Sequence, residues 1–186
     1  PTYPLSPEAY HQTWARGGGI NGETTKYGYT LKLKHNGAEE FGGPLFWSHY
    51  SYLGLDPRNL KDQYANYWDE TRNHVMIDYQ YCIENPKGFK GYGADCWGLT
   101  ASYSVNGYNA HMPSNDLGVI SPTAALSSFP YSPEESMRAA RYFYEKLGDK
   151  LWGPYGFYDA FSETENWFPK QYLAIDQGPI VVMIEN

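Results

Sequence analysis

Residues 132–148 read SPEESMRAARYFYEKLG, and this stretch carries the clearest fold signal in the chain. Ser132 precedes a proline at the first helical position, and Glu135 stands three residues after Ser132, which is the spacing of a capping box. Gly148 is the kind of residue that ends a helix. In between, apolar residues recur at three- and four-residue spacing: Met137, Ala140, Phe143, Tyr144 and Leu147. The stretch therefore predicts an amphipathic helix from Pro133 to a stop at Gly148.

The same start signal, a capping side chain followed by proline, recurs at Ser6-Pro7, Asp56-Pro57 and Ser121-Pro122. The longest predicted helix covers about residues 57–84, and the sequence ENPKG stops it. Its apolar positions follow helical spacing: Leu60, Tyr64, Tyr67, Trp68, Val75, Tyr79 and Ile83. We also expect a shorter helix over residues 96–103 and a last helix that begins near Asp176.

Strand signals are few. KYGYTLKLK (26–34) alternates well enough for one arm of a hairpin, and GFYDAF (156–161) favours a short strand. The predicted fold class is therefore mainly α with a minor β-hairpin. Three long connections, rich in Gly and aromatic residues, are the candidate walls of a cleft, because binding residues gather on loops held by a rigid scaffold. They cover residues 42–56, 87–100 and 151–161. Packed crossings between helices are the other interpretation.

Composition narrows the function classes. The chain has 186 residues, the length of one domain, and a net charge of −7, whereas nucleic-acid-binding proteins usually show clustered Lys and Arg. No segment has the roughly 18 consecutive apolar residues of a membrane span. Aromatic residues make up 18%, with 19 Tyr and 6 Trp, and their flat apolar faces with polar handles suit sugar rings. A Tyr-rich core explains the same count. Cys82 and Cys96 allow one disulfide or none.

Several kinds of catalytic site are absent from the sequence: it has no G-x-S-x-G elbow, no phosphate-binding Gly loop and no H-E-x-x-H. The histidines are scattered, so we expect no metal and no cofactor. What remains is carboxylates beside aromatic residues: Asp95 near Trp97, Asp159 after Tyr158, Glu165 before Trp167, and Asp176 before Gln177. At the start of an apolar helix, Asp176 suits an ionised general base and, equally, a simple cap.

Four long motifs resemble one family, the bacterial glucoamylase-like domain that includes the endo-β-1,2-glucanases; a related domain occurs in cyclic β-1,2-glucan synthases. The motifs are GGPLFWSHYSYLGLDPR (42–58), YCIENPKGFKGYGADCWGLTASYS (81–104), GVISPTAALSSFPYSPEESMRAARYFYEKLGDKLWGPYGFYDAF (118–161) and YLAIDQGPIVVMIEN (172–186). The resemblance covers nearly the whole chain from about Gly42. It implies that residues 1–186 are a single partial domain, the C-terminal portion of an (α/α)6 toroid, or six-hairpin barrel.

For function, the resemblance implies inverting, endo-acting hydrolysis of β-1,2-glucan without a metal. The proton-donor Glu of the family lies upstream of this chain, and the base-side carboxylate falls on Asp176. Sugar rings would then stack on or contact Trp97, Trp167, Tyr92 and Tyr158. Their hydroxyls would bond His49, Asp95, Asp159 and Gln177. The expected partners are an oligo- or polysaccharide and a complementary N-terminal segment, with no nucleic acid and no membrane.

Two other functions stay open from the sequence. One is a non-catalytic glucan-binding or glucan-synthase-associated module, which the absence of the acid from this chain allows. The weaker one is hydrolysis of α-glucans, as the family name suggests. No leader is visible at PTYPLSPEAY (1–10), but the chain does not begin with Met, so its N-terminus leaves export open. We expect a periplasmic or secreted protein.

Overall fold

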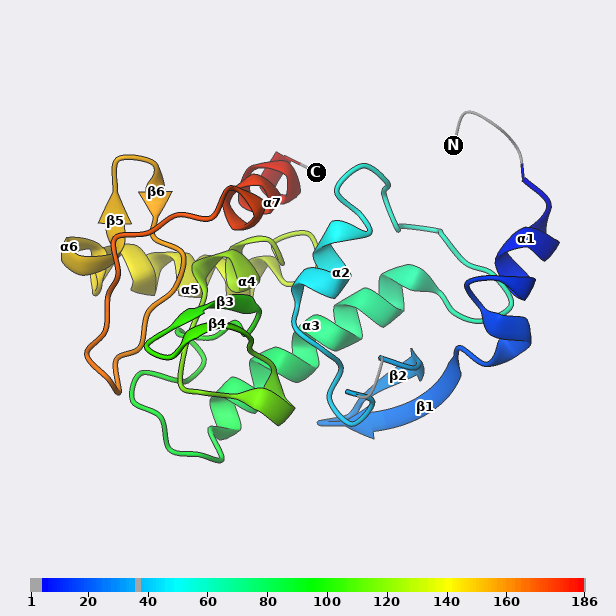
Figure 1. Ribbon diagram of the computed structural model, residues 1–186, viewed down its shortest axis with the longest axis horizontal. Coiled ribbons are helices and arrows are strands. Elements are labelled where there is room, and N and C mark those ends of the chain that lie inside the picture. Colours follow the sequence, from blue (N-terminus) through cyan, green and yellow to red (C-terminus); the bar gives the residue numbers. More distant parts are fainter. Residues whose placement is uncertain (1–4, 36–37, 186) are drawn as a thin grey trace.

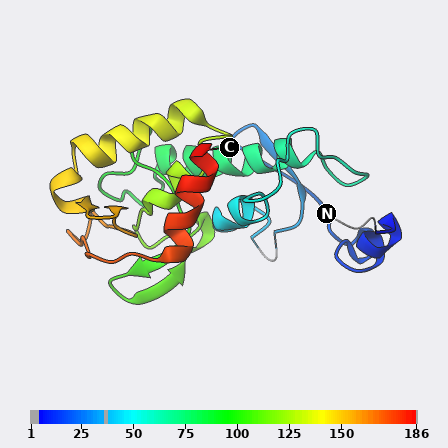
Figure 2. The ribbon, with the colours of Figure 1, turned by 90° about the horizontal axis from the view of Figure 1, so that it is seen from above.

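The computed structural model describes residues 5–35 and 38–185, and it is mainly helical with small sheets (Figures 1 and 2). The helices are α1 Pro7–Gln12, α2 Phe46–Tyr50, α3 Tyr67–Glu84, α4 Pro122–Leu126, α5 Pro133–Glu145, α6 Gly148–Leu151 and α7 Ala174–Glu185, with 3-10 turns at Arg16–Gly18 and Pro113–Asn115. The strands form antiparallel pairs: β1 Asn21–Lys26 with β2 Tyr29–Leu33, β3 Ala101–Ser104 with β4 Gly107–Ala110, and β5 Trp152–Gly153 with β6 Gly156–Phe157. No helix in the described ranges is long and apolar enough to cross a membrane.

Helix α3 is the longest element, and the β1–β2 hairpin packs on it (Figure 1). It begins at Tyr67, not near Pro57 as the sequence predicted. The Asn66 side chain caps it by accepting from the N–H of Trp68 at 3.2 Å. Residues 57–66 form turns instead, because the Asp62 carboxylate accepts from two nearby backbone N–H groups. The predicted end at Glu84 is confirmed, with the next residue left-handed.

The helix expected over residues 96–103 is wrong. Residues 97–100 are irregular and β3 begins at Ala101. Gly98 has φ +123°, and an added Cβ there would lie 2.9 Å from the Ala124 Cβ, so this glycine lets the chain pass close to α4. The Leu99 N–H donates to Asp78 Oδ1 on α3 at 3.1 Å rather than to a helical carbonyl. Tertiary contacts thus replace the helical bonds.

Helix α5 differs from its prediction in three ways. The Ser132 hydroxyl donates to the Ser128 carbonyl instead of accepting a capping bond, so no capping box forms with Glu135. The helix buries Ser136, Ala139 and Phe143, while two members of the predicted stripe, Met137 and Tyr144, are exposed. Gly148 opens α6 rather than ending α5.

Other predicted elements are confirmed. Ser6 caps α1, α4 begins at Pro122, and α7 spans Asp176. The hairpin arm expected over 26–34 is the shorter β2, Tyr29–Leu33, which a turn at Tyr27-Gly28 joins to β1. The expected strand at 156–161 is reduced to β6 and a single bridge. Cys82 and Cys96 are both buried and both free thiols. Helices α3, α4 and α5 share one core with neighbouring loops, whose largest fully buried side chains include Trp97, Phe143 and Phe161.

Candidate active site

The first turn of α7 holds Asp176 inside the protein, where 4% of its surface is exposed. Pro179 lacks the N–H that would bond the Ile175 carbonyl four residues earlier. The Tyr50 hydroxyl, from α2, donates to that carbonyl instead. The Thr123 hydroxyl, from α4, donates to the Asp176 carbonyl at 2.6 Å. Side chains of α2 and α4 therefore fix the first turn of α7 and the position of Asp176.

Asp159 meets Asp176 from a different part of the chain. The segment after β6 is tied to the start of α4, because Ile120 and Phe161 exchange backbone hydrogen bonds of 3.0 and 2.9 Å. The backbone N–H of Tyr103, in β3, donates to Asp159 Oδ2 at 3.4 Å. The Asp159 side chain, 1% exposed, lies next to the Asp176 carboxyl, and the two groups perturb each other's pKa. Four elements converge on this pair.

The electrostatics of the pair follow from burial and from two like charges close together. Burial, with the hydrogen bond and negative charge of Asp159, raises the pKa of Asp176 to about 8. Burial also raises the pKa of Asp159. The pair therefore holds a proton at neutral pH. This corrects the expectation that the helix N-terminus keeps Asp176 ionised, because desolvation outweighs the helix dipole here. Asp159 Oδ1 and Asp176 Oδ2 have no hydrogen-bond partner within the protein.

Two tyrosines near Asp176 were not singled out from the sequence. Burial raises the pKa of Tyr50 to about 12, and the charge of Asp176 adds to the effect. Burial and then the charge of Asp176 also raise the pKa of Tyr108, on β4. Both phenols thus lie within electrostatic reach of the pair. The loop of the hairpin that carries Tyr108 is Val105-Asn106, since Ser104 pairs with Gly107. Asn106 and Gly107 are residue types common at hairpin turns, so the sequence held a signal for this hairpin.

Two predicted residues adjoin the pair in sequence, and both contact other protein groups. Gln177 donates from Nε2 to the Phe157 carbonyl at 3.1 Å, which holds α7 against β6. The ring of Tyr158 is 8% exposed and packs against Tyr172, with centroids 5.0 Å apart. The prediction that Tyr158 offers a ring face to sugar is corrected, because the surrounding aromatic residues cover that ring. Asp159 likewise bonds protein groups rather than standing at the surface.

The predicted aromatic residues of the 87–100 connection do not reach Asp176. Trp97 is fully buried, edge-to-face with Tyr79 at 5.3 Å, so the prediction that it stacks on sugar is corrected. The Tyr92 hydroxyl donates to Asp116 Oδ1 at 2.8 Å, in a separate polar cluster. Asp95 is exposed and pairs with Arg138 at 3.6 Å. The fourth aromatic prediction, Trp167, is half-buried and forms a bridge with Ser162.

The buried histidines serve the packing of the helices. The Nε2 of His49 bonds the Ser128 hydroxyl at 2.9 Å, and burial lowers the pKa of this ring to about 3. The ring is therefore neutral, and its enclosure corrects the prediction that it bonds a sugar hydroxyl. His74 lies between the Ser48 hydroxyl and the Gly43 carbonyl. Across residues 5–35 and 38–185, no three His, Cys, Asp or Glu side chains gather as a metal-binding group.

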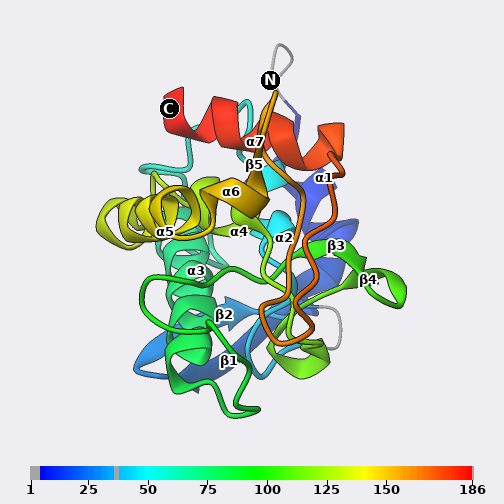
Figure 3. The same cartoon turned by 90° about the vertical axis from the view of Figure 1, so that its left-hand side faces the viewer.

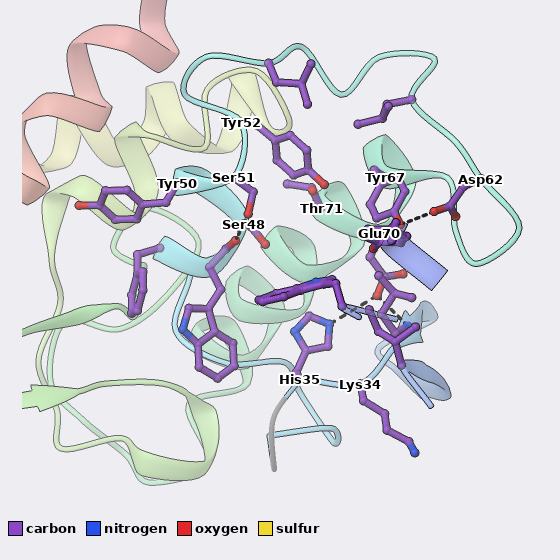
Figure 4. Close-up of a pocket in the computed structure, with 18 residues that line it drawn as sticks. Lys34, His35, Ser48, Tyr50, Ser51, Tyr52, Asp62, Tyr67, Glu70 and Thr71 are labelled. Atoms are coloured by element: carbon purple, nitrogen blue, oxygen red, sulfur yellow. Dashed lines mark hydrogen bonds and ion pairs between the residues drawn. The ribbon is translucent and has the colours of Figure 1, made fainter. Parts of the chain in front are cut away.

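A hollow of about 700 Å³ lies beside α2, on the other side of Tyr50 from α7 (Figure 4). Figure 4 shows Ser48, Tyr50 and Tyr52 from α2 and the following turn, with Tyr67 and Glu70 of α3 across from them. The Glu70 carboxylate accepts from the N–H groups of Lys32 and Leu33 and so closes one wall. Much of the remaining lining is apolar or aromatic: Tyr10, Trp14, Ile20, Phe46, Trp47, Leu55 and Leu60.

Comparison with known proteins shows the family to which this chain belongs. A family model described as “Putative glucoamylase” matches residues 1–186. The chain belongs to this glucoamylase-like family. An endo-β-1,2-glucanase from Chitinophaga pinensis, solved with sophorotriose and glucose, is 64% identical with a TM-score of 0.96. That match covers 100% of this chain and 45% of the solved one.

Two further relatives extend the comparison. A solved protein from Bacteroides uniformis, described as a “putative glucoamylase”, is 60% identical with a TM-score of 0.93 over 100% of this chain and 45% of its own. The exo-β-1,2-glucooligosaccharide sophorohydrolase of Parabacteroides distasonis is 44% identical, with 100% of this chain and 28% of that protein covered. The glucoamylase-like chain thus spans less than half the length of these relatives.

Proposed function

We propose that this chain is the C-terminal portion of the catalytic domain of an inverting endo-β-1,2-glucanase, and that Asp176 is its general base. The observation that carries the proposal is the buried Asp159–Asp176 carboxyl pair, which four elements hold in place. Two of its oxygens, Asp159 Oδ1 and Asp176 Oδ2, accept no hydrogen bond from the protein. Raised carboxyl pKa values of this kind gather at functional sites. The endo-acting relative is 64% identical and the exo-acting one 44%, which favours the endo mode.

The chemistry follows from the needs of inversion. An inverting hydrolase places one carboxyl group on each side of the scissile bond, roughly 6.5–9.5 Å apart, so that a water fits on one side. The ionised Asp176 takes a proton from that water, directly or through a sugar hydroxyl, as the water oxygen attacks the anomeric carbon. The leaving oxygen takes its proton from an acid outside this chain. Asp159 holds the Asp176 carboxyl in place and tunes its proton affinity.

The rest of the fold belongs to the proposal as well. Helix α7 buries Asp176, Pro179 and Met183, but it exposes Val181 and Ile184 by 71% and 55%. A helix that is apolar on all sides is normally buried on all sides. A complementary N-terminal segment, completing an (α/α)6 toroid, covers this face and the hollow beside α2. A purified 186-residue chain that is monomeric and melts cooperatively contradicts this part.

Among the other predicted contacts, Trp167 and Gln177, both half-buried, remain our candidates for binding sugar. We also propose that the protein acts in the periplasm or outside the cell. Fractionation of the source cells tests that location, and recovery of the protein only with cytoplasmic markers contradicts it. A non-catalytic glucan-binding role is the alternative that the next experiment separates from hydrolysis.

The test is Asp176→Asn in the intact protein, meaning this chain together with whatever polypeptide its gene adds. The amide keeps the size of the side chain but takes no proton, and loss of a general base lowers turnover by about 10²–10⁴-fold. Glucan binding, measured by retardation in gels containing β-1,2-glucan, stays nearly unchanged. The matched control is Asp149→Asn, an exposed carboxylate in the first turn of α6. Equal turnover of Asp176→Asn and wild type overturns the assignment.

A further inference from the structure

We propose that Tyr108, braced by Tyr103 on the β3–β4 hairpin, is a stacking platform for a glucose unit next to the bond that is cleaved. This inference rests on the proposed function and adds a binding residue that the sequence did not single out. Figure 3 shows the hairpin extending away from the helices, below the level of α7.

The two rings are exposed and hold each other in place. Tyr103 and Tyr108 are direct cross-strand partners in the antiparallel pair. Their centroids are 5.5 Å apart and their planes 77° apart, an edge-to-face contact that aromatic pairs favour. Tyr108 is nevertheless 53% exposed and Tyr103 37%. A fixed ring with an open surface binds a second ring with little loss of side-chain entropy.

The platform is attached to the carboxyl pair through the backbone. The N–H that donates to Asp159 Oδ2 is that of Tyr103 itself, at 3.4 Å. The Tyr108 phenol lies within electrostatic reach of both Asp159 and Asp176. A hairpin that is bonded to one carboxyl and reaches the other is held in register with the reacting group. Whatever stacks on Tyr108 is therefore positioned relative to Asp176.

The chemistry of the surface selects the ligand. The ring faces are flat and apolar, and the phenol oxygens are hydrogen-bonding groups. A glucose unit matches this, since it has C–H faces and hydroxyl edges and no charge. Val105, at the tip, is 51% exposed and extends the apolar surface outward. We therefore assign the hairpin to a sugar of the same neutral glucan chain.

The experiment compares Tyr108→Ala, Tyr108→Phe and Tyr144→Ala in the intact protein, using linear β-1,2-glucan for both turnover and gel retardation. Tyr144 is the matched control, because it is 58% exposed on α5 and meets Trp152 edge-to-face at 5.2 Å. Tyr108→Ala raises KM and weakens retardation about tenfold, which corresponds to ~1.4 kcal/mol, with kcat changed less than about twofold. Tyr108→Phe keeps the ring face and binds like wild type, and so does Tyr144→Ala.

The outcomes separate the two proposals. Wild-type hydrolysis with unchanged KM and retardation in Tyr108→Ala overturns the platform and leaves the hydrolase standing. Retardation that depends on Tyr108, without hydrolysis by the wild type, supports the platform and contradicts the hydrolase. Equal weakening by Tyr144→Ala, or by Tyr108→Phe, also overturns the platform, since neither change removes a ring face beside Asp176. Absence of glucan binding by the wild type overturns it too.

Discussion

Substitution of Asp159 by Asn tests how the carboxyl pair works. The pKa of Asp176 is about 8, so at pH 6 only about 1% of this carboxyl is in the basic form. Burial is the largest cause of the raised pKa, and the hydrogen bond and charge of Asp159 follow. Asp159→Asn removes the charge and offers an amide donor to the Asp176 carboxylate, while burial remains. The pKa of Asp176 therefore falls below 8 but stays above the ordinary value near 3.9.

The assay is the pH dependence of kcat/KM on β-1,2-glucan. A base with a lower pKa is ionised at lower pH, so the acid limb of the profile moves to lower pH in Asp159→Asn. A fall of one pKa unit is about 1.4 kcal/mol and raises activity at pH 6 about tenfold relative to the plateau. Asp95→Asn, at an exposed carboxylate, leaves the limb in place. An acid limb that is unmoved, or shifted to higher pH, refutes the reasoning about the pair.

The same pair makes the stability of the protein depend on pH. A folded-state pKa raised above the unfolded value means that the native protein binds more protons, so stability is highest below about pH 4 for this group and falls as pH rises toward 8. Asp176→Asn removes this contribution. The measurement compares the unfolding free energies of the wild type and Asp176→Asn at pH 5 and pH 8. An equal pH slope in both proteins contradicts the prediction. Gly98→Ala forces a Cβ to 2.9 Å from Ala124 Cβ at φ +123° and costs about 2 kcal/mol or more of unfolding free energy, whereas Gly107→Ala has an open site and costs less. A smaller loss for Gly98→Ala than for Gly107→Ala contradicts the close approach to α4.

Local signals in the sequence predicted the elements whose causes are local. The Ser6-Pro7 start, a hairpin arm within residues 26–34 and the helix through Asp176 all formed as expected. Asp56-Pro57 carries the same start signal but no helix, because the Asp56 carboxylate bonds the Arg58 backbone and side chain in a turn. Helical spacing alone did not reveal that Asn66 supplies the cap ten residues later.

The sequence predicted which residues belong to the site better than it predicted which of them meet. Asp159 and Asp176 were both singled out, yet nothing in their spacing indicated that their side chains meet, since the contact depends on the Ile120–Phe161 bridge. Trp97 is a residue type that often binds sugars, but here it packs against Tyr79 of α3 and lies in the core. The opposite holds for Tyr108. Asn106 and Gly107 are turn-type residues that signal its hairpin, but the exposure of Tyr108 follows only from the folded chain.

The most direct measurement is reducing-sugar release by the intact protein from linear β-1,2-glucan, with starch in parallel and Asp176→Asn beside the wild type. The account predicts release from β-1,2-glucan by the wild type, about 10²–10⁴-fold less by Asp176→Asn, and none from starch. Release from starch, no release from either glucan, or equal release by the two proteins would contradict the claim that Asp176 is the base of a β-1,2-glucanase.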